Sequence, residues 1–210
     1  MRVIAIDGPA GAGKSTVARG LAARLRLAYL DTGAMYRGVT FAALRRGIDP
    51  DDADLVAHLV RDLEMTVADT ATTVDGVDAS VEIRGPEVTR AVSIVAANPA
   101  VREELNRRQR EWARAHDGGV IEGRDIGSVV FPDADLKLYL TASPEVRAGR
   151  RHREVTDMQY EDVAASIAER DALDQGRAND PLVKADDAVV IDTTNRPVDD
   201  ILDEIEGLLR

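Results

Sequence analysis

The 210-residue sequence has no cysteine, which excludes disulfide bonds and any zinc site built on cysteine ligands. Aromatic residues make up only 3% of the chain, so its core must consist mainly of valine, isoleucine, leucine and alanine. The hydrophobic content of 44% suffices for such a core, and the length suits one α/β domain with small insertions. No apolar run approaches the length of a membrane span, and the first residues lack a signal-peptide pattern. We therefore expect a cytoplasmic protein that does not bind a membrane.

Positive charge is also scarce. The formal net charge is −11, which argues against nucleic-acid binding, because duplex binders normally present a basic face. Only three residues are lysine, against 24 arginines. An acidic protein that binds anionic ligands has to gather its arginines locally, so the arginine positions are informative. Nothing in the chain indicates a protein partner, and we expect a monomer.

The clearest motif lies in residues 2–16, RVIAIDGPAGAGKST. A short apolar strand leads into Gly8, Gly13, Lys14 and Ser15, which fit the phosphate-binding pattern G-x-x-x-x-G-K-[ST]. The glycines let successive N–H groups point into one concavity, and the positive end of the following helix favours an anion at the same place. Lys14 can reach the terminal phosphates of a nucleotide, and the Ser15 hydroxyl is suitably placed to ligate Mg²⁺. The motif therefore predicts a nucleotide-phosphate site.

Short apolar strands alternate with amphipathic helices along the chain. This order is typical of a parallel sheet covered by helices on both faces, and we predict a doubly wound P-loop fold with five parallel strands. The strands are expected at 3–6, 27–30, 120–122, 136–140 and 188–191, and the helices at 14–26, 34–46, 51–63, 86–97, 100–115, from 143 onward, and at 160–173 and 198–209.

Residues 64–86 interrupt this alternation. They are rich in valine and threonine and contain an Asp75-Gly76 turn signal, which predicts two or three short antiparallel strands. We therefore expect a small insertion in the doubly wound core.

Charged residues gather where the predicted strands end, in segments 31–37 and 122–125, and again late in the chain in 169–177. Substrates of this fold bind at the carboxyl ends of the strands. Arg170, Asp174 and Arg177 are spaced four and three residues apart, which predicts that they share one helix face. For a single arginine, an exposed ion pair is the common alternative. The triplet Asp-Thr-Gly at 31–33 also occurs in aspartic proteases, but that all-β fold with its second aspartate does not match this chain.

Four segments together, GPAGAGKST, DTGAMYR, EGRDIGSVVFPDA and ERDALDQGR, with RRQR at 107–110, resemble bacterial cytidylate kinases. The resemblance extends from about residue 2 to residue 205. It implies transfer of the γ-phosphoryl group of ATP to CMP or dCMP, with Mg²⁺. It also implies a core of 1–62 and 99–210, a nucleoside-monophosphate-binding insertion at 63–98, and a short lid at about 148–160. Thr32 stands where the family often has serine, which keeps the hydroxyl.

The resemblance further implies a role for individual residues. Lys14, Arg124, Arg170 and Arg177 would be catalytic, Ser15 would contact Mg²⁺, and Arg147, Arg150 and Arg151 would belong to the lid. The ATP phosphates would be bound by Gly8, Pro9, Ala10, Gly11, Ala12, Gly13, Lys14, Ser15 and Thr16. CMP would be bound by Thr32, Tyr36, Arg37, Ser93, Arg102, Arg124, Asp125, Arg170, Asp174 and Arg177, with Ser93, Arg102 and Asp125 reading the cytosine ring.

Elementary chemistry agrees with these roles. Cytosine offers an amino donor beside two acceptors, which suit a carboxylate or hydroxyl and a guanidinium respectively. A monophosphate dianion suits bidentate arginines. Three other interpretations were weighed: another P-loop small-molecule or nucleoside monophosphate kinase of adenylate or uridylate type, a GTPase-like switch, and a nucleotide-binding module without activity. A GTPase would need an N-K-x-D tetrapeptide, which the sequence lacks. An intact Lys14, Ser15 and arginine set argues against the inactive module.

Overall fold

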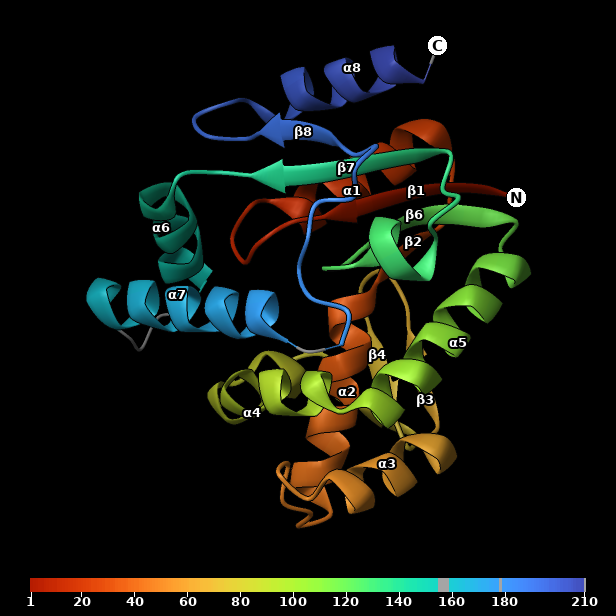
Figure 1. Cartoon of the computed structure of the whole chain (residues 1–210), viewed down its shortest axis with the longest axis vertical. Helices are drawn as coiled ribbons and strands as arrows, with labels where there is room; N and C mark the ends of the chain where they lie inside the picture. The colour runs from red at the N-terminus through yellow and green to blue at the C-terminus, as the bar shows by residue number, and fades with distance from the viewer. Residues whose placement is uncertain (155–158, 178, 210) are drawn as a thin grey trace.

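A computed structural model describes residues 1–154, 159–177 and 179–209, and its centre is a five-stranded parallel sheet in the order β2-β6-β1-β7-β8 (Figure 1). The predicted fold class is confirmed. The strands are β1 (Arg2–Asp7), β2 (Tyr29–Asp31), β6 (Gly118–Glu122), β7 (Leu136–Thr141) and β8 (Val189–Asp192). The helices are α1 (Lys14–Leu25), α2 (Thr32–Arg45), α3 (Ala53–Asp62), α4 (Pro86–Ala97), α5 (Pro99–Ala115), α6 (Pro144–Glu154), α7 (Tyr160–Gly176) and α8 (Val198–Leu208).

The two faces of the sheet bury different helices, because successive side chains of a strand point to opposite sides. Ile4 and Ile6 of β1 pack in a cluster with residues of α1 and α8. Val3 and Ala5 pack in another cluster with residues of α2, α3, α4 and α5. Figure 1 shows the arrowheads of β7 and β8 pointing toward the side on which α6 and α7 lie. The carboxyl edge of the sheet therefore faces these two helices.

A separate three-stranded antiparallel sheet forms the predicted insertion. Its strands are β3 (Met65–Val67), β4 (Thr72–Val74) and β5 (Val77–Asp78), followed by a short 3₁₀ helix, η1 (Glu82–Arg84). The turn between β4 and β5 has Asp75 at φ 49° and Gly76 at φ 73°, as a two-residue hairpin of this kind requires. The antiparallel strands predicted for residues 64–86 are confirmed.

Two predicted boundaries are wrong for local reasons. The strand predicted at 27–30 begins only at Tyr29, because the C-terminal cap of α1 includes Leu27, whose N–H donates to the carbonyl of Ala22 at 2.9 Å. Helix α2 begins at Thr32, two residues earlier than predicted. The Asp31 carboxylate caps it by accepting from the N–H of Ala34 at 3.0 Å.

Two short helical elements were not predicted, the 3₁₀ helix η1 and a further turn. A single turn of π-helix, η2 (Ile126–Val130), follows the segment that carries Arg124 and Asp125. Of the predicted lid at about 148–160, residues 148–154 belong to α6, Gln159 and Tyr160 mark the start of α7, and 155–158 lie outside the described residues. Within the described parts of the chain, no helix combines the length and apolar character that crossing a membrane requires.

Candidate active site

The phosphate-binding motif forms a loop between β1 and α1. Gly8, Gly11 and Gly13 all have positive φ values, 146°, 74° and 85°, and Gly13 caps the N-terminus of α1. At Gly8 a Cβ atom would lie 2.1 Å from the carbonyl oxygen of Leu140 in β7, so the loop begins at a point where the backbone touches the neighbouring strand. The strand, loop and helix that the motif requires are all present.

Side chains of α6 and of the segment after β8 donate hydrogen bonds to the backbone carbonyl groups of this loop. Arg147 of α6 donates to the carbonyl of Ala10 at 3.0 Å, and Arg150 donates to that of Gly11 at 3.3 Å. The Thr193 hydroxyl, just after β8, donates to the carbonyl of Ala12 at 3.0 Å. Two of the predicted lid arginines therefore contact the outer side of the phosphate loop in this structure.

Lys14 lies at the start of α1 with only 7% of its surface exposed. Its Nζ donates to the carbonyl of Pro9 at 2.9 Å. The pKa of Lys14 is lowered to about 7, chiefly by burial and then by the charge of Arg124, while the Glu122 carboxylate opposes both effects. Burial therefore disfavours the positively charged form of Lys14, and an anionic ligand bound beside it would favour that form.

Asp7, the last residue of β1, joins the phosphate loop to the turn that carries Arg124 and Asp125. Its two carboxylate oxygens accept from the N–H groups of Ile126 and Gly127, both at 2.8 Å. These two hydrogen bonds to consecutive amides fix the point at which the π-helical turn η2 begins. Asp7 was not among the predicted site residues, although a charged residue at the end of an otherwise apolar strand indicates a position of this kind.

Burial raises the pKa of the Asp7 carboxyl from 3.8 to about 6, against the effect of its two amide donors. The fold therefore favours the protonated form, and this stabilisation is complete below about pH 4 and lost as the pH rises through about 6. We expect the free energy of unfolding of the wild type, minus that of Asp7→Asn, to decrease by about 3 kcal/mol between pH 4 and pH 7.5. Urea unfolding at both pH values measures it. The exposed Asp133→Asn is the control, and an equal difference at both pH values would contradict the assignment.

Three arginines lie around Asp174, and the charges of two of them, Arg124 and Arg170, lower the pKa of Lys14. Arg124 donates from Nε to Asp174 of α7 at 2.8 Å, and the Arg177 guanidinium lies 3.8 Å from the same carboxylate. The pKa of Arg170 is lowered to about 10, chiefly by burial and then by the charge of Arg124. Among the described residues, Nε of Arg170 and both Nε and Nη2 of Arg177 are buried without a hydrogen-bond partner. Unpaired buried donors of this kind indicate a site that an anionic ligand completes.

Arg37 of α2 belongs to the same group of charges. Its Nη1 donates to the carbonyl of Ile83 at 3.0 Å and to the hydroxyl of Thr89 at 2.9 Å. Burial lowers the pKa of Arg37 to about 9, and the neighbouring charges of Arg170 and then Arg151 add to the effect. Hydrogen bonds to residues of the insertion therefore position the Arg37 guanidinium near Arg170 of the core.

The hydroxyl of Thr32 in α2, which was predicted to belong to the CMP site, makes a hydrogen bond within the protein. The hydroxyl donates to the carbonyl of Glu122 at 2.6 Å, which leaves its oxygen as an acceptor. Burial raises the pKa of the Glu122 carboxyl, and the charge of Asp31 adds to this effect. Thr32 therefore joins the end of β6 to the start of α2.

A second cluster surrounds Arg102 of α5, which is 2% exposed. Its guanidinium donates to Asp125 and, from Nε, to Asp180 at 2.9 Å, and it lies 5.5 Å from the centre of the Tyr36 ring. The Tyr36 hydroxyl is buried with no partner among the described residues. Ser93 is half-buried on α4, one turn before Ala96, whose carbonyl accepts from Arg102 at 3.3 Å. The predicted cytosine-reading residues thus lie in one region.

One predicted relationship is wrong. Arg177 does not continue the helix face of Arg170 and Asp174, because α7 ends at Gly176 and Arg177 has extended backbone angles, φ −61° and ψ 136°. The Arg177 side chain nevertheless lies close to Asp174. The spacing therefore correctly predicted that the two residues are near each other, but not through a shared helix face. Sequence reasoning also missed Asp180, where the dipeptide Asp-Pro at 180–181 signalled only a turn.

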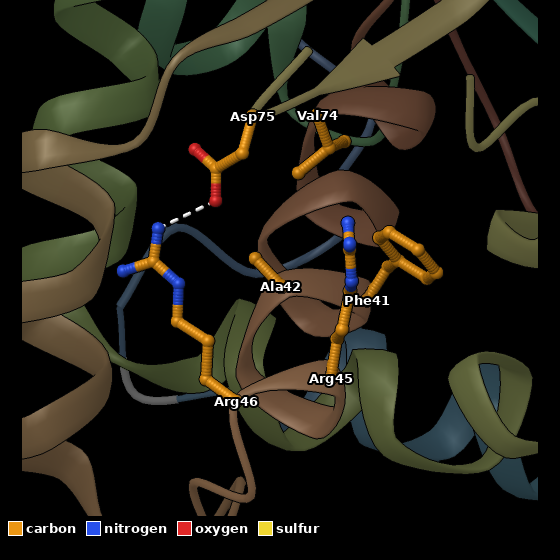
Figure 2. Close-up of a pocket in the computed structure, with 6 residues that line it drawn as sticks. All are labelled: Phe41, Ala42, Arg45, Arg46, Val74 and Asp75. Atoms are coloured by element: carbon orange, nitrogen blue, oxygen red, sulfur yellow. Dashed lines mark hydrogen bonds and ion pairs between the residues drawn. The ribbon is translucent and has the colours of Figure 1, made fainter. Parts of the chain in front are cut away.

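Two surface hollows lie away from these clusters. Figure 2 shows one of about 280 Å³, beside the end of α2, in which Arg46 pairs with Asp75 at 2.5 Å while Arg45 stands next to Phe41. The other, of about 350 Å³, lies near the N-terminus and is lined in part by Arg110 and Phe131. Neither hollow is lined by a residue of the predicted site.

Comparison with known proteins gives consistent matches over the chain. The family model described as cytidylate kinase matches residues 4–210. A cytidylate kinase from Corynebacterium efficiens is 49% identical over 208 residues, which is 95% of this chain and 90% of that protein. The chain belongs to the cytidylate kinase family. This confirms the resemblance that the four sequence segments indicated.

The family also contains larger relatives. A bifunctional pantoate ligase/cytidylate kinase from Synechococcus sp. (strain JA-2-3B'a(2-13)) is 50% identical over 220 residues, which is 99% of this chain but only 40% of that protein. Among solved structures, a shikimate kinase from Bacteroides thetaiotaomicron has a TM-score of 0.52 at 14% identity and covers 99% of this chain and 98% of its own. This likeness shows the fold that the cytidylate kinase family shares with it.

Proposed function

We propose that this chain transfers the γ-phosphoryl group of ATP to CMP or dCMP, giving ADP and CDP or dCDP. The observation that carries the proposal is the meeting of two groups of positive charge. Lys14 belongs to the phosphate loop, and the residues whose charges lower its pKa, Arg124 and Arg170, belong to the other group. Two anionic ligands brought together at this point would place a donor phosphate beside an acceptor phosphate.

The donor side is the loop of residues 8–16. Its glycines and the start of α1 supply backbone N–H groups for the ATP phosphates, and Lys14 would exchange its contact with Pro9 for the terminal phosphates. The pKa of Lys14, about 7 in the ligand-free site, would rise beside a triphosphate, because a negative neighbour favours the ammonium form.

The acceptor side combines phosphate and base recognition. The unpaired nitrogens of Arg170 and Arg177 would take the monophosphate together with Arg37 and Arg124, while Asp174 positions Arg124 and Arg177. At the other end, Arg102 would donate to the cytosine ring acceptors and Asp125 would accept from its amino group, with Ser93, Tyr36 and Thr32 completing the surroundings.

Chemistry at this site requires positioning and positive charge more than a nucleophilic side chain. The transition state of phosphoryl transfer spreads negative charge over the moving group, and the guanidinium groups and Lys14 surround that position. In-line attack by an acceptor phosphate oxygen needs no covalent intermediate. Arg151, whose charge lowers the pKa of Arg37, would extend this positive surface from α6, together with Arg147 and Arg150 in the lid.

The residues present fit Mg²⁺ only when nucleotide phosphates are bound. Among the described residues, no group of three acidic, histidine or cysteine side chains could hold a metal ion by itself. The half-buried Ser15 hydroxyl stands at the start of α1, and Mg²⁺ commonly uses one or two protein oxygens with phosphates and waters. When bound there, the ion would supply charge neutralisation between the donor phosphates.

A coupled assay with ATP and each of CMP, dCMP, UMP and AMP tests the proposal. CMP or dCMP is expected to be the best acceptor and AMP to be inactive, because adenine is larger than cytosine and lacks the second acceptor, the O2 carbonyl, that the Arg102 guanidinium would bind beside Asp125. Asp125→Ala is expected to reduce the preference for CMP over UMP about tenfold, by removing the acceptor for the cytosine amino group. An acceptor preference for AMP would favour the adenylate-type alternative, and one for UMP the uridylate type.

The proposal retains the remaining expectations from the sequence: a cytoplasmic enzyme of pyrimidine metabolism, monomeric, without nucleic-acid or membrane partners. Light scattering on the purified chain measures its assembly state. A stable dimer would revise the proposed monomer without affecting the proposed reaction.

A further inference from the structure

Asp180 lies beside the base-recognition cluster but has no part in the function proposed above. It belongs to the segment after α7, which folds back because the N–H of Leu182 donates to the carbonyl of Asp174 at 2.8 Å. Asp180 has φ 48°, a left-handed conformation that aspartate and asparagine tolerate better than most residues. Its Oδ2 accepts from Nε of Arg102 at 2.9 Å. The side chain is therefore held against one of the most buried arginines of the protein.

The guanidinium of Arg102 is divided between two carboxylates. Nε binds Asp180 and Nη2 binds Oδ2 of Asp125, while Nη1 donates to the carbonyl of Ala96. Nε and Nη2 form the edge of a guanidinium on which two parallel N–H groups can bind both oxygens of a single carboxylate. Here that edge is split, and two of the five N–H groups remain for a ligand.

Removal of the Asp180 side chain would free Nε to bind the second oxygen of Asp125. A fork of this kind would use both oxygens of Asp125 in one bidentate pair. The fork would turn the carboxylate into the plane of the guanidinium, so that its remaining lone pairs would no longer face the amino group of cytosine, whereas uracil, which has a carbonyl at the same ring position, would lose an unfavourable contact. The split edge therefore matters for discrimination between the two pyrimidines.

We propose that Asp180 is a positioning residue that determines specificity, because it occupies Nε of Arg102 and so keeps one oxygen of Asp125 available to the cytosine amino group. This inference rests on the proposed function and deepens it. An ordinary surface ion pair would have little effect. The side chain of Asp180 is only 29% exposed, however, and that of its partner 2%, so solvent screens this pair weakly.

Two substitutions separate the contributions of the side chain. Asp180→Gly removes it without strain at φ 48°, and Asp180→Asn keeps the shape and an acceptor oxygen but removes the charge. Asp186→Asn is the matched control, since it changes the same charge at an exposed position of the following loop. We expect the ratio of kcat/KM for CMP over UMP to fall roughly tenfold in the glycine variant, less in the asparagine variant, and not in the control.

The expected pattern is specific to a positioning role. The KM for CMP should rise while kcat at saturating CMP and the KM for ATP stay within about twofold, as for an interaction lost in binding alone. An unchanged CMP-to-UMP ratio in Asp180→Gly would overturn the inference. So would an equal loss for both acceptors, accompanied by a lower kcat and melting temperature. If the glycine variant fails to fold, Asp180→Asn decides by the same criteria.

Failure of the proposed function is distinguishable from failure of the inference. A wild-type protein that phosphorylates neither CMP nor dCMP would refute the reaction. Calorimetric affinities of CMP and UMP for the wild type and for Asp180→Gly would then test the inference, and equal affinity ratios in both proteins would overturn it. A wild type that prefers CMP, with variants that prefer it equally, overturns only the role of Asp180.

Discussion

Replacing Arg124 by alanine is expected to lower kcat/KM for CMP by about a thousandfold, the largest catalytic effect that the structure predicts. Arg124 follows β6 at the carboxyl edge of the sheet, its charge acts directly on Lys14, and Asp174 fixes its Nε at 2.8 Å. It therefore stands between the donor loop and the acceptor arginines. Its loss removes charge-assisted hydrogen bonds where the transferring group becomes most negative.

Steady-state kinetics with ATP and CMP measures this effect, and two further variants interpret it. Arg124→Lys keeps the charge without the planar fork, so it should recover part of the activity. Arg107→Ala removes an exposed arginine of α5 that pairs with Glu104 and Glu111, and should leave activity within about twofold. Because Asp174 loses a partner in Arg124→Ala, thermal unfolding must accompany the kinetics. Turnover like that of the wild type would contradict the role of Arg124.

Gly8→Ala is expected to reduce stability by about 3 to 5 kcal/mol and to abolish tight ATP binding. The new Cβ would lie 2.1 Å from the carbonyl oxygen of Leu140; it would be fixed to the backbone directly after β1, and the oxygen belongs to the backbone of β7, which pairs with β1. Relief requires the phosphate loop to move or β7 to shift from β1, and either movement displaces Lys14. No side-chain rearrangement can absorb a clash of this kind.

Urea unfolding and ATP binding by calorimetry test this second prediction. Gly207→Ala is the matched control: Gly207 lies in α8, and nothing stands within 4 Å of the position that a Cβ would take. Alanine there should change the free energy of unfolding by less than about 1 kcal/mol, because Gly207 is exposed in the last turn of the helix. A Gly8→Ala protein with normal stability and normal ATP affinity would show that the loop accommodates a side chain.

The parts of the fold that were predictable depend on local patterns. The phosphate loop is recognised by the fixed spacing of its glycines, lysine and serine, and the buried strands are recognised as short apolar segments. The Asp75-Gly76 hairpin was predictable because two positive φ values demand particular residues. Family resemblance, rather than periodicity, indicated Ser93, Arg102 and Asp125, and their roles stay predictions for the acceptor assays to test.

Long-range contacts account for the features that were missed. Asp7 caps η2 from 119 residues away along the chain, and Asp180 reaches Arg102 across 78 residues. Neither contact leaves a repeat, a spacing or a composition change in the sequence. Arg147 and Arg150 show the same limit, because periodicity places them on a helix but does not indicate that they bind the carbonyls of Ala10 and Gly11.

Those carbonyl contacts have a consequence for how the two ligands meet the protein. A trans peptide unit directs its oxygen and its hydrogen to opposite sides. With the oxygens of Ala10, Gly11 and Ala12 bound by α6 and Thr193, the N–H groups of Gly11 and Gly13 point away from these partners, while the N–H of Ala12 donates to the carbonyl of Pro9 at 3.4 Å. We therefore expect nucleotide phosphates to meet a phosphate loop whose backbone is already oriented, and a second anionic ligand to supply the partners that buried nitrogens of Arg170 and Arg177 lack within the described part of the chain.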